Sequence, residues 1–147
     1  MLVTTGQLGE AERLQRDSMA IAERVAAADP SNTQAERDLG ISYDNLARVL
    51  ENAGQLEAVE RLYRDSLAIA ERLAAADPGS AQAQGDLSYS YNNLAGVLVT
   101  AGQLAEAERL YRDSLAIAEQ LFGTDHQFTT DIRQKLEELN RPTRHRD

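Results

Sequence analysis

The segment from Glu60 to Glu71 reads ERLYRDSLAIAE, and close copies of it occur at two other places in this 147-residue chain. Glu12 to Glu23 reads ERLQRDSMAIAE, and Glu108 to Glu119 repeats the first segment letter for letter. Gly-Gln-Leu precedes each copy, and both intervals are 48 residues. Repetition at a fixed period of this length is typical of stacked helical units. The chain is therefore predicted to be a repeat array.

Each repeat contains two helical patterns separated by breaks. One segment runs from about Ser31 to Asn52 and its partner from about Leu56 to Ala76, each with apolar residues at helical spacing. Ser31 and Gln34 have the spacing of a capping box. Gly54 between the helices predicts a tight turn, and Asp77-Pro78 predicts the end of the second helix. Because the link is short, the two helices should form an antiparallel hairpin, and neighbouring hairpins should share a hydrophobic core. No sheet is expected.

Composition argues against several classes of function. The net charge of −9 is unfavourable for binding nucleic acid, because phosphate contacts need clustered Lys and Arg. The chain has no cysteine and only two histidines, His126 and His145, so no metal site or other cofactor is expected. No membrane span or secretion signal is visible, which predicts a cytoplasmic protein. The acids lie on regular helical faces without a nucleophile–base pair, so the chain is not expected to be an enzyme.

One helical pair resembles the tetratricopeptide repeat (TPR) consensus. Its first helix has an aromatic residue, Leu and a small residue in Tyr91-Asn92-Asn93-Leu94-Ala95, and Gly102 marks the turn before Ala107 and Tyr111. The stretch from Asn93-Leu94-Ala95 through Ala107-Glu108, with Leu121 to His126 after it, is similar to the kinesin light chain subgroup. The resemblance implies an all-α, TPR-like α-solenoid of antiparallel hairpins. The usual unit has about 34 residues, so a 48-residue unit implies elongated helices.

The predicted organisation is a single array over residues 1–140. It comprises a partial repeat (1–30), two repeats (31–78 and 79–124) and a capping helix (125–140). Residues 141–147 form a short basic tail that is expected to be disordered.

The resemblance implies that a protein or peptide partner binds along a concave groove lined by the first helix of each pair. Asn side chains there offer both a donor and an acceptor to an extended peptide. An alternative is that Asn45 and Asn93 bond to a neighbouring helix instead. Tyr63 and Tyr111 are expected in the core. The candidate groove residues are Asp44, Asn45, Arg48, Asn52, Tyr89, Asn92, Asn93 and Thr100.

A second hypothesis is self-association. The first predicted helix lacks its hairpin partner and should expose an apolar strip that includes Leu14, Met19, Ile21 and Val25. A second copy could cover this strip in a homodimer or in an end-to-end stack. Both hypotheses describe a protein-interaction module.

Overall fold

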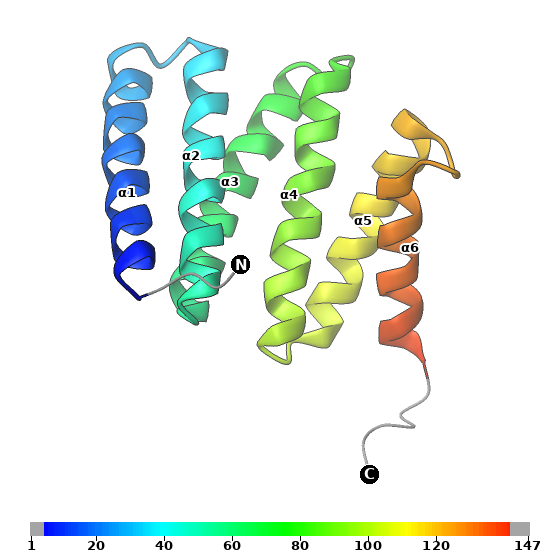
Figure 1. Cartoon of the computed structure of the whole chain (residues 1–147). Helices are drawn as coiled ribbons and strands as arrows, with labels where there is room; N and C mark the ends of the chain where they lie inside the picture. The colour runs from blue at the N-terminus through cyan, green and yellow to red at the C-terminus, as the bar shows by residue number, and fades with distance from the viewer. Residues whose placement is uncertain (1–4, 142–147) are drawn as a thin grey trace. The chain divides into compact units, whose positions relative to one another are not determined.

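The structure of the chain is a computed structural model that describes residues 5–141, and it is helical throughout (Figure 1). The predicted tail beyond Arg141 lies outside the described residues. No strand occurs between residues 5 and 141, so the all-α prediction is confirmed. The helices are α1 (Thr5–Ala28), α2 (Thr33–Asn52), α3 (Leu56–Ala76), α4 (Ala81–Thr100), α5 (Leu104–Phe122) and α6 (Gln127–Asn140).

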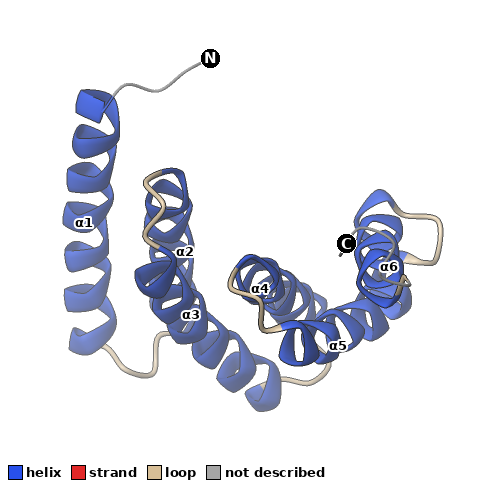
Figure 2. Cartoon of the chain, turned by 90° about the horizontal axis from the view of Figure 1, so that it is seen from below, coloured by secondary structure: helices blue, strands red, loops and turns tan. Residues whose placement is uncertain are grey.

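The first compact unit, Met1–Ala76, contains α1, α2 and α3. Helix α2 packs against both α1 and α3 (Figure 2). Its side chains Leu46, Ala47 and Leu50 are at most 1% exposed, and Val59 and Tyr63 of α3 complete this core. The apolar stripe of α2 is therefore buried by its two helical neighbours.

The second unit, Asp77–Asp147, repeats the arrangement in part. Helix α5 packs against α4 and α6. Leu94, Ala95 and Leu98 of α4 are fully buried, together with Ala107 of α5 and Ile132 of α6. The α4–α5 hairpin corresponds to the α2–α3 hairpin, and α6 covers the remaining side of α5.

The two hairpin turns are closed by glycine. Gly54 and Gly102 have φ values of 76° and 83°, in the left-handed region that glycine adopts without a steric cost. Gln55 then donates its backbone N–H to the carbonyl oxygen of Leu50, and Gln103 does the same to Leu98. The turn at Gly54 explains why α2 ends and α3 begins where the sequence predicts.

The predicted capping box at the start of α2 is wrong. The N-cap is Asn32, whose side chain accepts a hydrogen bond from the backbone N–H of Ala35. Ser31 instead donates to Asp29, and Gln34 donates to Asp38 one turn further on. Asn and Ser cap helices about equally well. Either Ser31 or Asn32 could have served as the N-cap of α2, and Asn32 does so.

Buried serines join the helices of each hairpin. Ser66 of α3 donates to the backbone oxygen of Gly40 on α2 at 3.2 Å. In the second hairpin the bond is reciprocal: Ser114 donates to the backbone oxygen of Ser88 at 2.7 Å, and Ser88 donates back to that of Ser114 at 2.8 Å. Small residues at these positions let each serine hydroxyl reach the backbone oxygen of the facing helix.

Candidate partner-binding surface

The candidate groove residues on α2 form one stripe along the helix. Asn45, Arg48 and Asn52 are spaced by three and four residues, so they return to the same helical face. Asn45 is half-buried and accepts a hydrogen bond from Arg48 at 3.0 Å, while Arg48 and Asn52 are exposed. Asn45 therefore pairs within its own helix rather than with a neighbouring one. Asp44 is half-buried beside this pair.

The equivalent stripe on α4 meets side chains from α6. Tyr89 is 49% exposed and stacks on Phe128 with ring centroids 4.2 Å apart. Asn92 is half-buried and accepts a hydrogen bond from Lys135 at 3.3 Å. Helices α4 and α6 together thus present an aromatic pair and a cation on one surface of the second unit.

Two further α4 residues belong to the same stripe. Asn93 is half-buried one residue after Asn92. Thr100 is exposed at the end of α4, and its hydroxyl donates to the backbone oxygen of Gly96 at 3.4 Å. The hydroxyl proton of Thr100 is therefore directed into its own helix, which leaves the oxygen as the atom that a partner would meet.

The surroundings of the buried tyrosine differ between the two hairpins. Tyr63 and Tyr111 are 4% and 3% exposed, as expected for core residues. The Tyr63 hydroxyl donates to Glu51 at 2.6 Å, and burial together with this bond raises the pKa of Tyr63. Val99 replaces Glu51 at the equivalent position beside Tyr111. Burial raises the pKa of Tyr111, and the negative charge of Glu138 raises it further.

Three residues at or beside these stripes were not among the candidates predicted from the sequence. Ile41 is 41% exposed and lies 48 residues before Tyr89, so the repeat interval was sufficient to find it. Phe128 and Lys135 come from α6, which begins 46 residues after α4 and so falls out of the repeat register. Lys135 adds a cation beside the α4 stripe, whereas the candidate residues predicted from the sequence include one cation, Arg48, on α2. Its ammonium also lies 5.8 Å from the centre of the Tyr111 ring.

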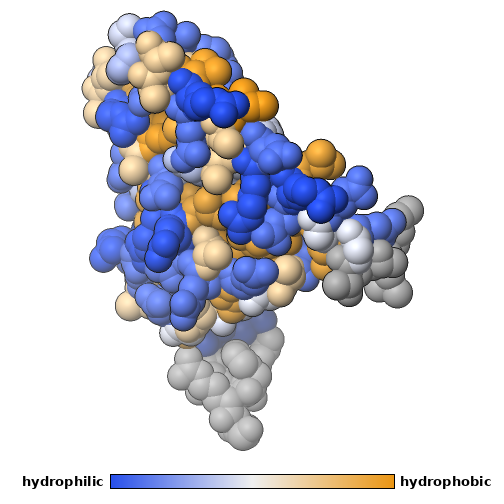
Figure 3. Space-filling model, turned by 90° about the vertical axis from the view of Figure 1, so that its left-hand side faces the viewer, coloured by the Kyte–Doolittle hydropathy of each residue, from blue (hydrophilic) through white to orange (hydrophobic). Residues whose placement is uncertain are grey.

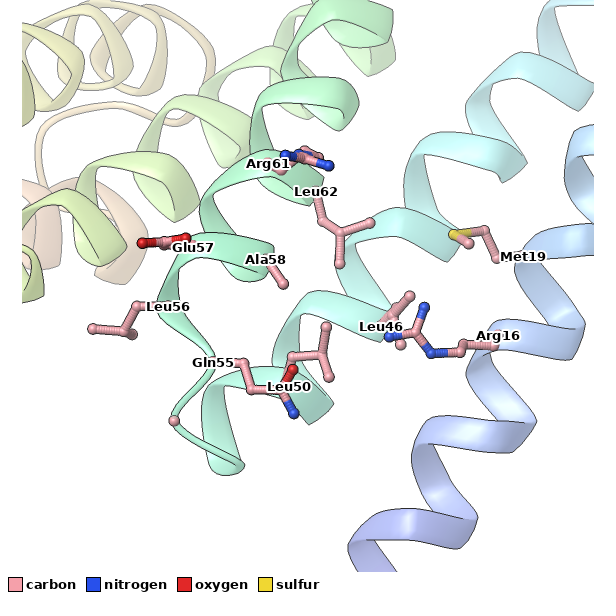
Figure 4. Close-up of a pocket in the computed structure, with 11 residues that line it drawn as sticks. Arg16, Met19, Leu46, Leu50, Gln55, Leu56, Glu57, Ala58, Arg61 and Leu62 are labelled. Carbon is pink, nitrogen blue, oxygen red and sulfur yellow. The ribbon is translucent and has the colours of Figure 1, made fainter.

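The four residues proposed for self-association do not share one face of α1. Leu14, Ile21 and Val25 are 59%, 54% and 50% exposed and lie along one side of the helix. Met19 is half-buried and lines a pocket of about 650 Å³ that α1, α2 and α3 form together. Figure 4 shows Met19 and Arg16 extending from α1 toward Leu46 and Leu62 across this pocket.

The described residues hold no cluster that could bind a metal ion. Among residues 5–141, no group of three or more His, Asp or Glu side chains is placed to hold a metal ion. None of the described helices is long and apolar enough to span a membrane. What the surface does offer is hydrogen-bonding amides, exposed aromatic rings and single charges on rigid helices, which are the means of recognising another protein.

Helical-hairpin repeat proteins are the class that this architecture defines. A model of the tetratricopeptide repeat matches residues 1–30, 40–78 and 87–128. The chain therefore belongs to the tetratricopeptide repeat family, and the resemblance inferred from its sequence is confirmed.

Solved structures share this fold. A kinesin light chain candidate of Podosopora anserina with nearly identical TPR-like repeats superposes with a TM-score of 0.70 at 22% identity, over 91% of this chain and 57% of its own. A second structure of that protein gives the same TM-score and identity, and 58% of its length is covered. BtubC (BKLC) from P. vanneervenii gives a TM-score of 0.59 at 17% identity, over 90% of this chain and 65% of its own.

These similarities define the fold and leave the partner open. The chain spans between 57% and 65% of the solved chains that it matches. No curated protein matches it closely enough to count as a relative. TPR proteins are in general non-enzymatic interaction scaffolds.

Proposed function

We propose that the chain binds a protein or peptide partner, and that the α4 stripe with its α6 neighbours is the principal contact surface. The single observation that carries this proposal is the exposed ring of Tyr89, which stacks on Phe128 while half of its surface stays open to solvent. A fixed, exposed aromatic side chain gains contact area on binding at little cost in conformational entropy. A cytoplasmic location is part of this proposal.

The polar groups around Tyr89 suit an extended peptide. Asn92 and Asn93 carry amide groups that both donate and accept, and Lys135 adds a positive charge beside them. The α2 stripe repeats the amide at Asn45 and adds Arg48. The expected partner has backbone amides that hydrogen-bond to Asn92 and Asn93, an apolar side chain that packs on Tyr89, and an acidic side chain that pairs with Lys135.

The proposal is tested by selecting peptides from a displayed random library against the intact chain and measuring their affinities by calorimetry. Tyr89→Ala should weaken binding by at least tenfold, because it removes the exposed ring. Leu104→Ala is the control: Leu104 is 36% exposed at the start of α5, a helix that contributes no residue to the stripe. Selected peptides that bind both variants equally well would contradict the proposed surface.

Self-association is a second proposed function, supported by a separate observation. Three of the large apolar side chains that are exposed among residues 5–141 lie on one face of α1: Leu14, Ile21 and Val25. Apolar surface gathered in this way is typical of a contact with another protein. This contact and partner binding by α4 involve different helices.

A further inference from the structure

The buried tyrosine of the first hairpin has a carboxylate and a cation from its own unit. The Tyr63 hydroxyl donates to the Glu51 carboxylate at 2.6 Å. Burial and Glu51 raise the pKa of Tyr63, and the guanidinium of Arg48 partly offsets them, so a positive charge also lies near this pair. The hydrogen-bonding capacity of the Tyr63 hydroxyl as a donor is therefore used within the first hairpin.

The second hairpin has the tyrosine without the carboxylate. Tyr111 stands 48 residues after Tyr63, but Val99 replaces Glu51. No residue between 5 and 141 makes a hydrogen bond with the Tyr111 hydroxyl. The Tyr111 side chain is 3% exposed, yet its hydroxyl oxygen is not sealed from solvent. A polar group that is this deeply set and has no partner is uncommon in folded proteins, and it calls for a ligand.

A glycine leaves space beside the Tyr111 hydroxyl. Gly96 stands where the first hairpin has Arg48. A Cβ atom on Gly96 would lie 3.8 Å from the hydroxyl oxygen of Tyr111, which is an ordinary contact distance. A longer side chain at position 96 would therefore start next to this oxygen. Because glycine has no side chain, an atom from outside the chain can approach the hydroxyl.

A cation lies near the same tyrosine, and α6 supplies it. The Lys135 ammonium lies 5.8 Å from the centre of the Tyr111 ring and donates to Asn92 at 3.3 Å. An ammonium has three N–H donors, so the bond to Asn92 leaves two for a ligand. Helices α4 and α6 both lie on one side of α5 (Figure 2). Tyr111, Lys135 and Asn92, with Gly96 beside them, are called the Tyr111 site below.

We infer that the Tyr111 site binds the side-chain carboxylate of an Asp or Glu residue in the partner, in the role that Glu51 has in the first hairpin. The inference rests on the proposed binding of a peptide by the α4 stripe, and it adds a buried donor that determines specificity. The Tyr111 hydroxyl donates to one carboxylate oxygen, as Tyr63 does to Glu51, and Lys135 balances the charge. Charge-assisted hydrogen bonds of this kind are stronger than neutral ones.

One acidic group of the chain opposes such a ligand. Glu138 is exposed and follows Lys135 by three residues. Burial raises the pKa of Tyr111 and the charge of Glu138 raises it further, so the hydroxyl stays protonated and remains a donor at neutral pH. The same charge repels an incoming carboxylate. Glu138→Gln should therefore strengthen the binding of an acidic peptide.

The first experiment changes the chain and the peptide together. A peptide selected from the displayed library is remade with Asn or Gln in place of its Asp or Glu. Tyr111→Phe should weaken binding of the acidic peptide by about tenfold or more in calorimetry, and should leave the affinity of the amide version unchanged. Tyr63→Phe is the matched control, because the hydroxyl that it removes is bonded to Glu51. Amidation of the peptide's C-terminus should have no effect, since the expected ligand is a side chain.

The site and the α4 surface fail in different ways. Selected peptides without an acidic residue, or acidic peptides that bind Tyr111→Phe as well as the wild type, would overturn the Tyr111 site. A loss of binding in Tyr89→Ala would then still support the α4 surface. Peptides that bind both variants like the wild type, or a library that yields no peptide, would overturn both.

The exposed apolar side chains of α1 are another place where a peptide could bind. Figure 3 views the molecule from the side on which α1 lies, and hydrophobic surface is visible there between hydrophilic side chains. Ile21 is 54% exposed on this helix. Ile21→Ala should leave the affinity of the acidic peptide unchanged. A loss as large as that caused by Tyr111→Phe would place the peptide on α1 and overturn the inference.

The last experiment supplies the missing carboxylate from α4 itself. Val99→Glu puts a glutamate at the position equivalent to Glu51, where it should accept the hydrogen bond from Tyr111 and exclude the partner's carboxylate. Binding of the acidic peptide should fall by about tenfold or more. Val99→Gln is the matched control, because it adds a side chain of nearly the same size without the charge, and it should cause a smaller loss. Equal losses in the two variants would show that size alone blocks the site, which would contradict a carboxylate ligand.

Discussion

Ser88 and Ser114 each donate a side-chain hydroxyl to the other's backbone oxygen, and this buried pair joins the middle of α4 to the middle of α5. In the first hairpin, Gly40 occupies the place of Ser88, so only Ser66 donates there. The two hairpins are built alike, but at this position the second has one more serine hydrogen bond between its helices. The equivalent serine of α1, Ser18, is exposed.

Ser114→Ala should therefore destabilise the chain more than Ser66→Ala. The first change removes the donor to the backbone oxygen of Ser88 and also the hydroxyl that lies 3.0 Å from the Ser88 hydroxyl, whereas the second removes one bond worth about 1 kcal/mol. Urea unfolding of both variants measures the difference. Equal losses would show that the reciprocal bond adds nothing to the hairpin.

Ala107→Arg should disrupt the second hairpin, while Arg112→Ala should change stability by less than about 0.5 kcal/mol. Ala107 is fully buried where α5 packs against its neighbours, so a long charged side chain has no space there. Arg112 is a mostly exposed residue paired with Glu108 one turn earlier, and such surface pairs contribute little. Thermal melts of the two variants test this, and similar losses would contradict the assignment of inner and outer faces.

Stability should fall as the pH rises above about 10, the ordinary pKa of tyrosine. Burial and the bond to Glu51 raise the pKa of Tyr63, so the folded chain holds this proton more tightly than the unfolded chain. The resulting stabilisation is fully present below pH 10 and is lost as the pH approaches the higher pKa of the folded state. Tyr63→Phe should be less stable at pH 8 but should lose less stability between pH 8 and pH 11. Urea unfolding at both pH values checks this, and parallel losses in the two proteins would contradict it.

The double change Asn45→Ala with Asn93→Ala should weaken partner binding more than it lowers stability. Asn45 bonds only to Arg48 of its own helix at the surface, so its removal should cost less than about 1 kcal/mol. Calorimetry of unfolding, and of binding to a selected peptide, separates the two effects. A large loss of stability would assign these asparagines a structural role.

The repeat interval predicted much of the fold. α3 begins and ends at the residues expected, because Gly54 fixes its start and Asp77-Pro78 follow its last residue. Leu46, Leu94 and the two core tyrosines are buried as their helical spacing indicated. These features depend on local chemistry that recurs in each unit, which is why a single sequence was sufficient.

The features that were not predicted depend on three-dimensional geometry that the repeat interval does not determine. The cap of α2 was misassigned because Ser31 and Asn32 are both good capping residues, and only backbone geometry selects Asn32. Lys135 and Phe128 were missed because α6 departs from the 48-residue interval. Met19 was grouped with Leu14 and Ile21 by its apolar character, but its angular position on α1 directs it toward α2.

Hydrogen exchange of the intact chain with and without a selected peptide tests the central claim most directly. Because the peptide should pair with the side chains of α4 and α6, amide protection should increase in α4 around Tyr89 and Asn92 and in α6 around Lys135, and should stay unchanged in α1. Protection that increases in α1 instead, with none in α4 or α6, would contradict the proposal that this surface binds the partner.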